Sequence, residues 1–336
     1  MKIAILHNRI GKNAHKDELD ILAQADAVTR ALEELEHDVT KLDFSLNLYE
    51  MTMSLQMLKP DLVFNLADSL QGEGRLIHFA TSILDQLNLP YTGCKTEALF
   101  LTSNKLVAKR LMRLRGIPTP EWMSLESPDE SLATLNEPFL LKSIWEHASV
   151  GMDTDSLVTV QEKEELRTVL KQKNGDFFAE RYIEGREFNL SLLGGEEKIE
   201  VLSPAEMKFF DYPKDRPKIL GYDAKWNEES SEYHSTRRSF EFHEKDRSLL
   251  ETLKDLALKC WKCFDLNGYA RVDFRVDERD NPYVLEINAN PCIAPDSGFV
   301  MAAKQSSISY TRMVECIVDH PVPHGAFRQV KKKMVL

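Results

Sequence analysis

Two runs near the end of the chain, ARVDF at residues 270–274 and LEINANP at residues 285–291, decide its fold. Both are apolar at every second position, which is the period of a β-strand with one buried face. This alternation places Arg271 and Asp273 on the same face of the first strand. The residues Asp-Asn-Pro at 280–282 favour a turn, so the pattern predicts that the two strands pair as a hairpin.

The same alternation places Glu286 and Asn288 on one face of the second strand. Once the strands pair, we expect the oxygen atoms of Asp273, Glu286 and Asn288 to gather on one surface of the hairpin. Two carboxylates and a carboxamide leave a coordination shell incomplete. Such a set suits Mg²⁺, with Mn²⁺ as the alternative, when nucleotide phosphates supply the remaining oxygens. Asn290 and Pro291 end the strand and turn backbone N–H groups toward the same place. The other interpretation is an acidic, solvated hairpin.

Length and composition are those of a globular protein with two or three domains. The chain has 336 residues, of which 43% are apolar and 29% charged. It contains no apolar run of about 20 residues that could cross a bilayer, and polar residues follow its first six, so we expect a cytoplasmic protein. The net charge of −11 repels phosphate backbones, which disfavours general nucleic-acid binding.

The five cysteines are too few to form a disulfide framework in a chain of this length. Cys260-x-x-Cys263 resembles half of a zinc or redox motif, but it lies within an apolar pattern of helical spacing at 249–266. A second Cys or His pair that would complete such a site is missing nearby. We therefore expect a helix there rather than a metal site.

The first domain is predicted over residues 1–101. Short apolar runs at 3–6, 38–44 and 61–66 indicate strands, and a stretch of helical spacing follows each one. Alternating strands and helices favour a doubly wound α/β domain, with a parallel sheet covered by helices on both faces.

A central α+β domain is predicted over residues 102–193. It begins with a helix at 104–115, for which Thr102 or Ser103 is the expected N-cap and Gly116 the terminating residue. The pattern after this helix is strand, helix, strand, helix, strand.

The last domain is predicted over residues 194–336, with the hairpin near its end. Residues 211–239 are charged and carry scattered aromatic side chains. A loop of this length within a compact domain is typically a functional flap or a disordered segment. Residues 331–333 form a lysine run that we interpret as a solvated tail.

The order of several motifs resembles that of ATP-grasp ligases. The runs RVD at 271–273 and E-x-N-x-x-P at 286–291 look like the metal-binding core of that class, and the D-alanine–D-alanine ligase family is the most similar. The resemblance covers nearly the whole chain and includes LPYTG at 89–93, SNK at 103–105, SVGM at 149–152, AKW at 224–226, and Tyr310. It implies an ATP-grasp fold, ATP and Mg²⁺ as cofactors, small amino-acid-like or peptide-like substrates, and a homodimer.

The resemblance also implies a nucleotide site. Lys105 and Lys142 would hold the α- and β-phosphates, although each alone is typical of a surface lysine. The segment Glu180, Arg181, Tyr182 and Ile183 would face the adenine with its backbone, and Glu187 would accept hydrogen bonds from the ribose. Without the resemblance, residues 177–183 are an amphipathic strand.

Catalysis is implied to proceed through an acyl-phosphate, which an amine then attacks. Lys225 would approach the γ-phosphate, and Ser149 belongs to a lid loop at 146–152. Arg271 is expected to stabilise the tetrahedral oxyanion. Ser297 matches the serine that binds the carboxylate of the second substrate; its other interpretation is a helix N-cap.

The chain departs from the family pattern on the substrate side. The loop at 7–13 has no acidic residue where the family carries a glutamate, and that residue's serine and tyrosine partners are replaced by Ala148 and Trp226. Cys292 replaces a glycine near the intermediate. Glu73, in a Gly-Glu-Gly loop, becomes the candidate for recognition of a substrate amine. Whether D-alanine is used therefore stays open at this point.

Two other functions remain to be compared with ligation. A carboxylate kinase on the same scaffold would turn over without an amine, whereas a nucleotide-binding module would not turn over at all. The presence of Lys225 and Arg271 disfavours the module, because a protein that only binds nucleotide has no use for groups aimed at the γ-phosphate and the oxyanion.

Overall fold

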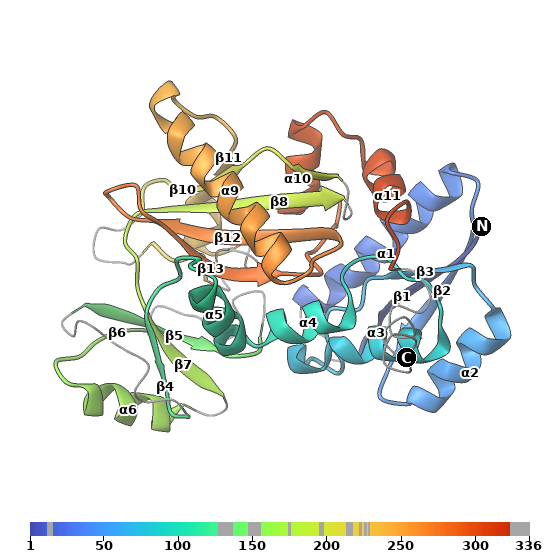
Figure 1. Ribbon diagram of the computed structural model, residues 1–336, viewed down its shortest axis with the longest axis horizontal. Coiled ribbons are helices and arrows are strands. Elements are labelled where there is room, and N and C mark those ends of the chain that lie inside the picture. Colours follow the sequence, from blue (N-terminus) through green and yellow to red (C-terminus); the bar gives the residue numbers. More distant parts are fainter. Residues whose placement is uncertain are drawn as a thin grey trace, which may run out of the picture.

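The computed structural model describes most of the chain, namely residues 1–11, 16–126, 137–146, 156–173, 176–194, 198–212, 218–221, 224, 227 and 229–322. It contains three sheets, each with its own helices (Figure 1). No helix in this part of the chain is both long and apolar enough to cross a membrane.

The N-terminal sheet is parallel, with strand order β2-β1-β3, as the alternating pattern predicted. Its strands are β1 (Lys2–Asn8), β2 (Asp38–Phe44) and β3 (Leu62–Asn65), and its helices are α1 (Lys16–Glu34), α2 (Leu48–Leu58) and α3 (His78–Leu87). A single parallel bridge from Val63 to Tyr91 extends the sheet. Helix α1 packs on one face together with α11 (Tyr310–Val318), while α2 and α3 cover the other face. Strand β1 is buried almost throughout because helices cover both of its faces.

The central sheet is antiparallel and lies beneath the C-terminal sheet in Figure 1. Its order is β4-β7-β5-β6, formed by β4 (Trp122–Ser124), β7 (Phe177–Arg181), β5 (Pro138–Ser143) and β6 (Leu157–Thr159). Helix α6 (Lys163–Gln172) covers one face by burying Leu166 and Leu170, which are four residues apart and therefore share one side of the helix.

The C-terminal sheet has six strands, in the order β11-β10-β8-β12-β13 with β9 paired to β8. The strands are β8 (Arg186–Gly194), β9 (Ile199–Val201), β10 (Ala205–Phe209), β11 (Thr236–Ser239), β12 (Gly268–Val276) and β13 (Pro282–Asn288). Helix α9 (Arg247–Cys263) packs across one face, and its buried Cys260 lies in the main apolar core. Two short helices follow the hairpin, α10 (Gly298–Gln305) and then α11.

Helices α4 (Thr96–Ser103) and α5 (Lys105–Leu114) connect the N-terminal sheet to the other two. Helix α5 contacts both α9 and β13, and its Leu106 packs against Trp122 of the central sheet. The expected N-cap at Thr102 or Ser103 is wrong. Asn104 caps this helix, because its Oδ1 accepts a 3.0 Å hydrogen bond from the Val107 N–H.

Two further predictions differ from the structure. The boundary expected at 193/194 falls at the end of β8, which pairs along its whole length with β12 and so belongs to the C-terminal sheet. The sheets divide instead at residues 182–185, between β7 and β8. The segment 211–239, expected to be a functional flap or a disordered segment, ends in strand β11, which pairs with β10. The hydrogen bonds that pair β8 with β12 and β10 with β11 join residues far apart in sequence. The local sequence pattern therefore does not predict these pairings.

Candidate active site

One face of the C-terminal sheet carries a row of polar side chains. Directly opposed residues on β8, β12 and β13 form two polar rungs, Asn189–Asp273–Glu286 and Ser191–Arg271–Asn288. The rung between them, Leu190–Val272–Ile287, faces the opposite side and is fully buried in the apolar core. The alternation therefore separates a functional face from a core face, and the predicted hairpin with Asp273, Glu286 and Asn288 on one surface is confirmed.

Asp273 is the centre of the hydrogen bonds on this face. Its two carboxylate oxygens accept bonds from the Arg271 guanidinium, both 2.8 Å long. The carboxamide of Asn189 donates at 2.7 Å and that of Asn288 at 3.1 Å. These contacts hold the carboxylate in one orientation on a buried strand, as a ligand that must be pre-positioned requires.

A β-bulge on β13 changes which side chains face the cleft. The register passes from Asp273 opposite Glu286 to Phe274 opposite Val284, so Leu285 is an extra residue. Leu285 and Glu286 both line the cleft. The bulge thus places an apolar surface directly beside the oxygen ligands.

The opposite wall carries buried lysines. Lys105, at the start of α5, lies 3.9 Å from the Glu286 carboxylate, and its Nζ donates to the backbone carbonyl of Glu146. Lys142, on β5, is 3.0 Å from Glu180 on β7. Lys109, one helical turn after Lys105, is also 3.0 Å from Glu180. Glu180 therefore balances two cations in the wall.

Burial controls the protonation of this wall. Burial lowers the pKa of Lys105 to about 8, and the nearby carboxylate of Glu286 opposes this change. Burial also lowers the pKa of Lys109 to about 8, and there the opposing carboxylate is that of Glu180. Burial alone would also lower the pKa of Lys142, but the carboxylates of Glu180 and Glu286 outweigh it and raise that pKa. Lys105 and Lys142 therefore lie near Glu286 of the C-terminal sheet, whereas Lys109 is paired with Glu180 of the central sheet.

The segment between the central and C-terminal sheets closes one end of the cleft. Tyr182 donates its hydroxyl to the Lys218 carbonyl at 3.3 Å, and the guanidinium of Arg275 lies 5.3 Å from its ring. Arg275 also lies 3.5 Å from Glu187. Gly185 has a φ of 139° and passes so close to β12 that a Cβ there would lie 2.1 Å from the Val276 carbonyl oxygen. Only glycine fits this turn.

The remaining members of this segment also line the cleft. Ile183 is buried beside it and offers an apolar side chain. Arg181 forms a 3.2 Å ion pair with Glu137. Residues 180–183 therefore lie within one wall of the cleft, and their expected contact with adenine stays a prediction.

The far end of the cleft is lined by α1, the loop after β13 and the start of α10. The thiol of Cys292 donates to Asp20 at 3.0 Å, and burial, followed by the Asp20 charge, raises its pKa well above the usual range. Asp20 itself has a raised pKa, chiefly because it is buried. Ser297 caps α10 by accepting a 3.4 Å hydrogen bond from the Val300 N–H. Its N-cap interpretation is confirmed, whereas its predicted contact with the carboxylate of the second substrate stays a prediction.

Glu73 lies outside the lining of the cleft, although Gly72 and Gly74 belong to it. Its half-exposed carboxylate pairs with Arg75 at 3.1 Å. The structure therefore does not bring Glu73 together with the other predicted residues. Ser149 and Lys225, and with them Ala148 and Trp226, lie outside the described residues.

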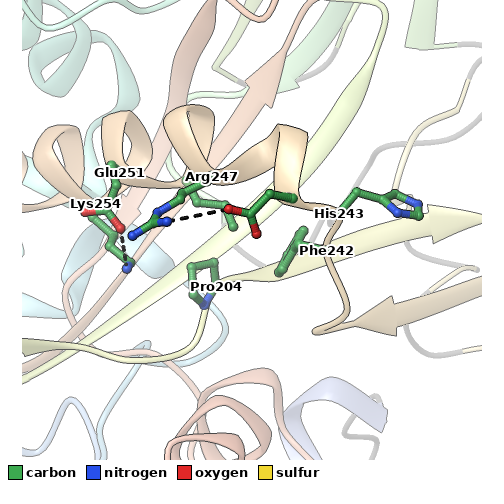
Figure 2. Close-up of a pocket in the computed structure, with 8 residues that line it drawn as sticks. Pro204, Phe242, His243, Arg247, Glu251 and Lys254 are labelled. Carbon is green, nitrogen blue, oxygen red and sulfur yellow. Dashed lines mark hydrogen bonds and ion pairs between the residues drawn. The ribbon is translucent and has the colours of Figure 1, made fainter.

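The cleft encloses about 1080 Å³ and reaches from Tyr182 to Ser297. A smaller hollow of about 260 Å³ lies beside α9, on another part of the surface (Figure 2). Its charged side chains pair with each other, Arg247 with Glu244 at 3.5 Å and Lys254 with Glu251 at 3.0 Å. The large cleft, where buried lysines face oxygen ligands, is the candidate active site.

Comparison with known proteins agrees with this geometry. Residues 111–319 match the family model described as the D-ala D-ala ligase C-terminus. The chain belongs to the D-alanine–D-alanine ligase family. It is accordingly an ATP-dependent carboxylate–amine ligase with the ATP-grasp fold, as its motifs predicted.

Individual relatives of this family cover nearly the whole chain. A D-alanine–D-alanine ligase of Aquifex aeolicus is 29% identical over 95% of this chain and 100% of its own length. An uncharacterised protein of Sinorhizobium fredii is 31% identical over 88% of this chain and 86% of its own length. The crystal structure of the Bacillus anthracis D-alanine–D-alanine ligase complexed with ATP shares the fold, with a TM-score of 0.71, 20% identity and 99% coverage of both chains.

Sequence reasoning missed several residues of this site. Lys109 follows Lys105 by four residues and so lies on the same helix face, a signal that was available. Asn189 alternates with Glu187 and Ser191 along β8, which also marks a polar strand face. Asp20 carries no comparable signal, because only the packing of α1 brings it to the cleft.

Proposed function

We propose that this ligase uses ATP and Mg²⁺ to activate the carboxylate of one amino-acid-like substrate and joins it to the amino group of a second. One observation carries the proposal: Lys105 and Lys142 face the oxygen ligands Asp273, Glu286 and Asn288 across a single cleft. A triphosphate requires cations on one side and a shared metal on the other.

The donor set fits a magnesium ion. Asp273 and Glu286 would supply carboxylate oxygens and Asn288 a carboxamide oxygen, which leaves room for phosphate oxygens. Among the described residues, no group of three or more His, Cys, Asp or Glu side chains is arranged to hold a metal, so a site made by protein alone is disfavoured there. A bound Mg²⁺ would neutralise negative charge that develops on the transferred phosphoryl group.

The side chains of the cleft have distinct tasks in this proposal. Lys105 and Lys142 bind and orient the phosphates, and residues 180–183 present backbone groups to the base, with Glu187 near the ribose. Arg271, oriented by its two bonds to Asp273, points its remaining N–H groups at the oxyanion formed when the amine attacks the acyl-phosphate.

The acyl-phosphate needs protection from water, since its hydrolysis would waste ATP. We assign Lys225 to the γ-phosphate and Ser149 to a lid over the phosphates, on the resemblance alone. Ser297, at the start of α10, is assigned to the carboxylate of the second substrate. The amide N–H groups of a first helical turn and a serine hydroxyl both favour an anion there.

The Aquifex aeolicus relative and the Bacillus anthracis structure are D-alanine–D-alanine ligases, and D-alanine is therefore one member of the proposed substrate class. The proposed substrate class extends beyond D-alanine, because the acidic groups at the end of the cleft expected to bind substrate differ from the family pattern. The end of β1 offers Asn8, whose carboxamide donates to Asp68 and, at 2.9 Å, to Ser69. Asp20 adds a carboxylate from α1.

The reaction is tested by measuring ADP release over amino acids, D-amino acids and dipeptides, singly and in pairs. Turnover that needs two substrates supports ligation. Turnover with one carboxylate and no amine would instead identify a carboxylate kinase, and nucleotide binding without turnover would identify a binding module.

The metal assignment is tested by Asp273→Ala and Glu286→Ala, each expected to abolish ADP release while the circular dichroism spectrum is retained. Glu278→Ala is the matched control, because Glu278 is an exposed carboxylate just beyond β12 on the same hairpin. Normal turnover in either of the first two variants would remove the metal assignment.

A further inference from the structure

Arg238 lies in the wall of the cleft and is not among the residues assigned to the nucleotide, the metal and the two substrates. It sits on β11 directly opposite Met207 of β10, and Met207 in turn is opposite Glu187 of β8, so all three share the cleft face of the sheet. Arg238, Ser297 and Gly298 all line the same cavity. The side chain therefore reaches the end of the cleft where α10 begins.

The guanidinium of Arg238 is packed closely against this helix start. One of its terminal nitrogens is 3.0 Å from the position that a Cβ on Gly298 would occupy. Its Nε is buried and has no hydrogen-bond partner in the described part of the chain. Gly298 thus leaves the space that the guanidinium needs, next to Ser297.

The charges around Arg238 do not neutralise it. Burial and the nearby Arg271 lower its pKa, whereas Asp296 and Asp273 oppose this change. Neither acid forms an ion pair with Arg238 within the described residues, and Asp273 is already bonded to Arg271. A guanidinium that is mostly buried and lacks a counter-ion is unfavourable, and an anionic ligand would relieve that cost.

The cleft then offers two anion-binding elements side by side. Ser297 and the first turn of α10 suffice for one carboxylate. Arg238 approaches from a different element, and a planar guanidinium is suited to bind a second carboxylate with two parallel hydrogen bonds.

We propose that Arg238 binds a second carboxylate of the amine substrate, so that the enzyme selects a dicarboxylic amino acid of the aspartate or glutamate type. This inference rests on the proposed function, because Ser297 must hold the substrate's α-carboxylate. Arg238 is then a specificity-determining residue, and it takes no part in the chemical step.

The test measures binding directly and does not depend on turnover. Aspartate, glutamate and alanine, each as both enantiomers, are titrated by calorimetry into the full chain saturated with ADP and Mg²⁺. We expect the wild type to prefer a dicarboxylic amino acid. Arg238→Gln should weaken that binding by about tenfold to a hundredfold, since a lost charge-assisted hydrogen-bond pair has this effect, and should leave alanine binding unchanged. Arg238→Lys should fall between the two.

Arg279→Gln is the matched control. Arg279 carries the same charge in the turn between β12 and β13, where it is exposed and does not line the cleft. If both variants weaken binding equally, the effect is one of net charge and the proposed contact is refuted. Equal losses for alanine and glutamate would show that Arg238 serves only the α-carboxylate, which also overturns the inference.

The two proposals fail in different ways. A dicarboxylic preference that depends on Arg238, together with no ADP release for any substrate pair, would support the Arg238 site and reject the ligation reaction. ADP release with neutral amino acids and no dicarboxylic preference in calorimetry would support ligation and reject the Arg238 site.

Discussion

Replacing Glu180 with glutamine tests the buried charge balance of the lysine-bearing wall of the cleft. Glu180 is 3.0 Å from both Lys109 and Lys142, and the three side chains are only 3%, 1% and 8% exposed. Removing one partner of a buried ion pair typically costs about 3–5 kcal/mol. Here a single substitution leaves two buried cations without their carboxylate, so we expect Glu180→Gln to lower the free energy of unfolding by about 3–5 kcal/mol at pH 7.

The loss should depend on pH in a defined direction. Without Glu180, burial is expected to lower the pKa of Lys109 and Lys142 below that of the unfolded chain. A lysine whose pKa is lower in the folded state destabilises the fold fully at pH values below that pKa, and the penalty is relieved as pH rises through it. In the wild type the pKa of Lys109 is already about 8. The part of the stability difference that comes from Lys109 should therefore shrink as pH rises toward 8. The part that comes from Lys142 should continue to shrink above pH 8, because the pKa of Lys142 is raised in the wild type.

Urea unfolding followed by tryptophan fluorescence measures this effect. Trp122 is a probe within the same wall, since the Lys109 ammonium lies 5.2 Å from its ring and the Arg113 guanidinium 4.0 Å. Glu137→Gln is the control, because its ion pair with Arg181 is partly exposed and is expected to contribute less than about 1 kcal/mol. Adding Lys109→Met to Glu180→Gln should recover part of the loss. A loss below about 1 kcal/mol, or one that does not change with pH, would refute the reasoning.

Three other predictions follow from single contacts. Because the pKa of Lys105 is about 8, the KM for ATP should rise above pH 8 by up to about tenfold per pH unit. Lys105→Arg should flatten this pH profile of KM, and an unchanged slope in the variant would exclude Lys105 as the cause of the rise. Gly185→Ala should lower the thermal midpoint, since its Cβ would lie 2.1 Å from the Val276 carbonyl, whereas Gly11→Ala, with nothing within 4 Å, should not. Peptide mapping after alkylation at pH 8 should find Cys292 largely unmodified. Asp20→Asn should speed the alkylation of Cys292, because Asp20 raises the pKa of this thiol. Equal alkylation rates in the variant and the wild type would contradict this role of Asp20.

The hairpin could be predicted because its information is local. Alternation along β12 and β13 fixes which side chains share a face, and the turn between them fixes their pairing. The turn and the alternation alone would place Asp273 opposite Leu285, and it is the bulge at Leu285 that brings Asp273 opposite Glu286 and Arg271 opposite Asn288. The N-terminal parallel sheet could be predicted for the same reason, since each strand and helix carries its own period.

The rest of the site depends on pairings between distant segments. Strand β8 joins the C-terminal sheet through β12, so the predicted boundary at 193/194 could not be corrected from local pattern. The bulge at Leu285 interrupts the strict alternation of buried and exposed side chains along β13, and the local sequence pattern does not predict it. Thr236–Ser239 is charged and short, and it becomes a strand only because β10 offers it an edge.

By itself, the sequence determined the identity and order of the chemical groups. These are two lysines, three side chains with oxygen atoms on a hairpin and an arginine beside them, because residue type and strand period are properties of neighbours along the chain. Only the tertiary structure decided which charges face each other. Glu180 lies between two lysines, and the buried Nε of Arg238 has no hydrogen-bond partner among the residues that the structure describes. Burial and distance in three dimensions set the electrostatic energy of each group, and neither is encoded in local spacing.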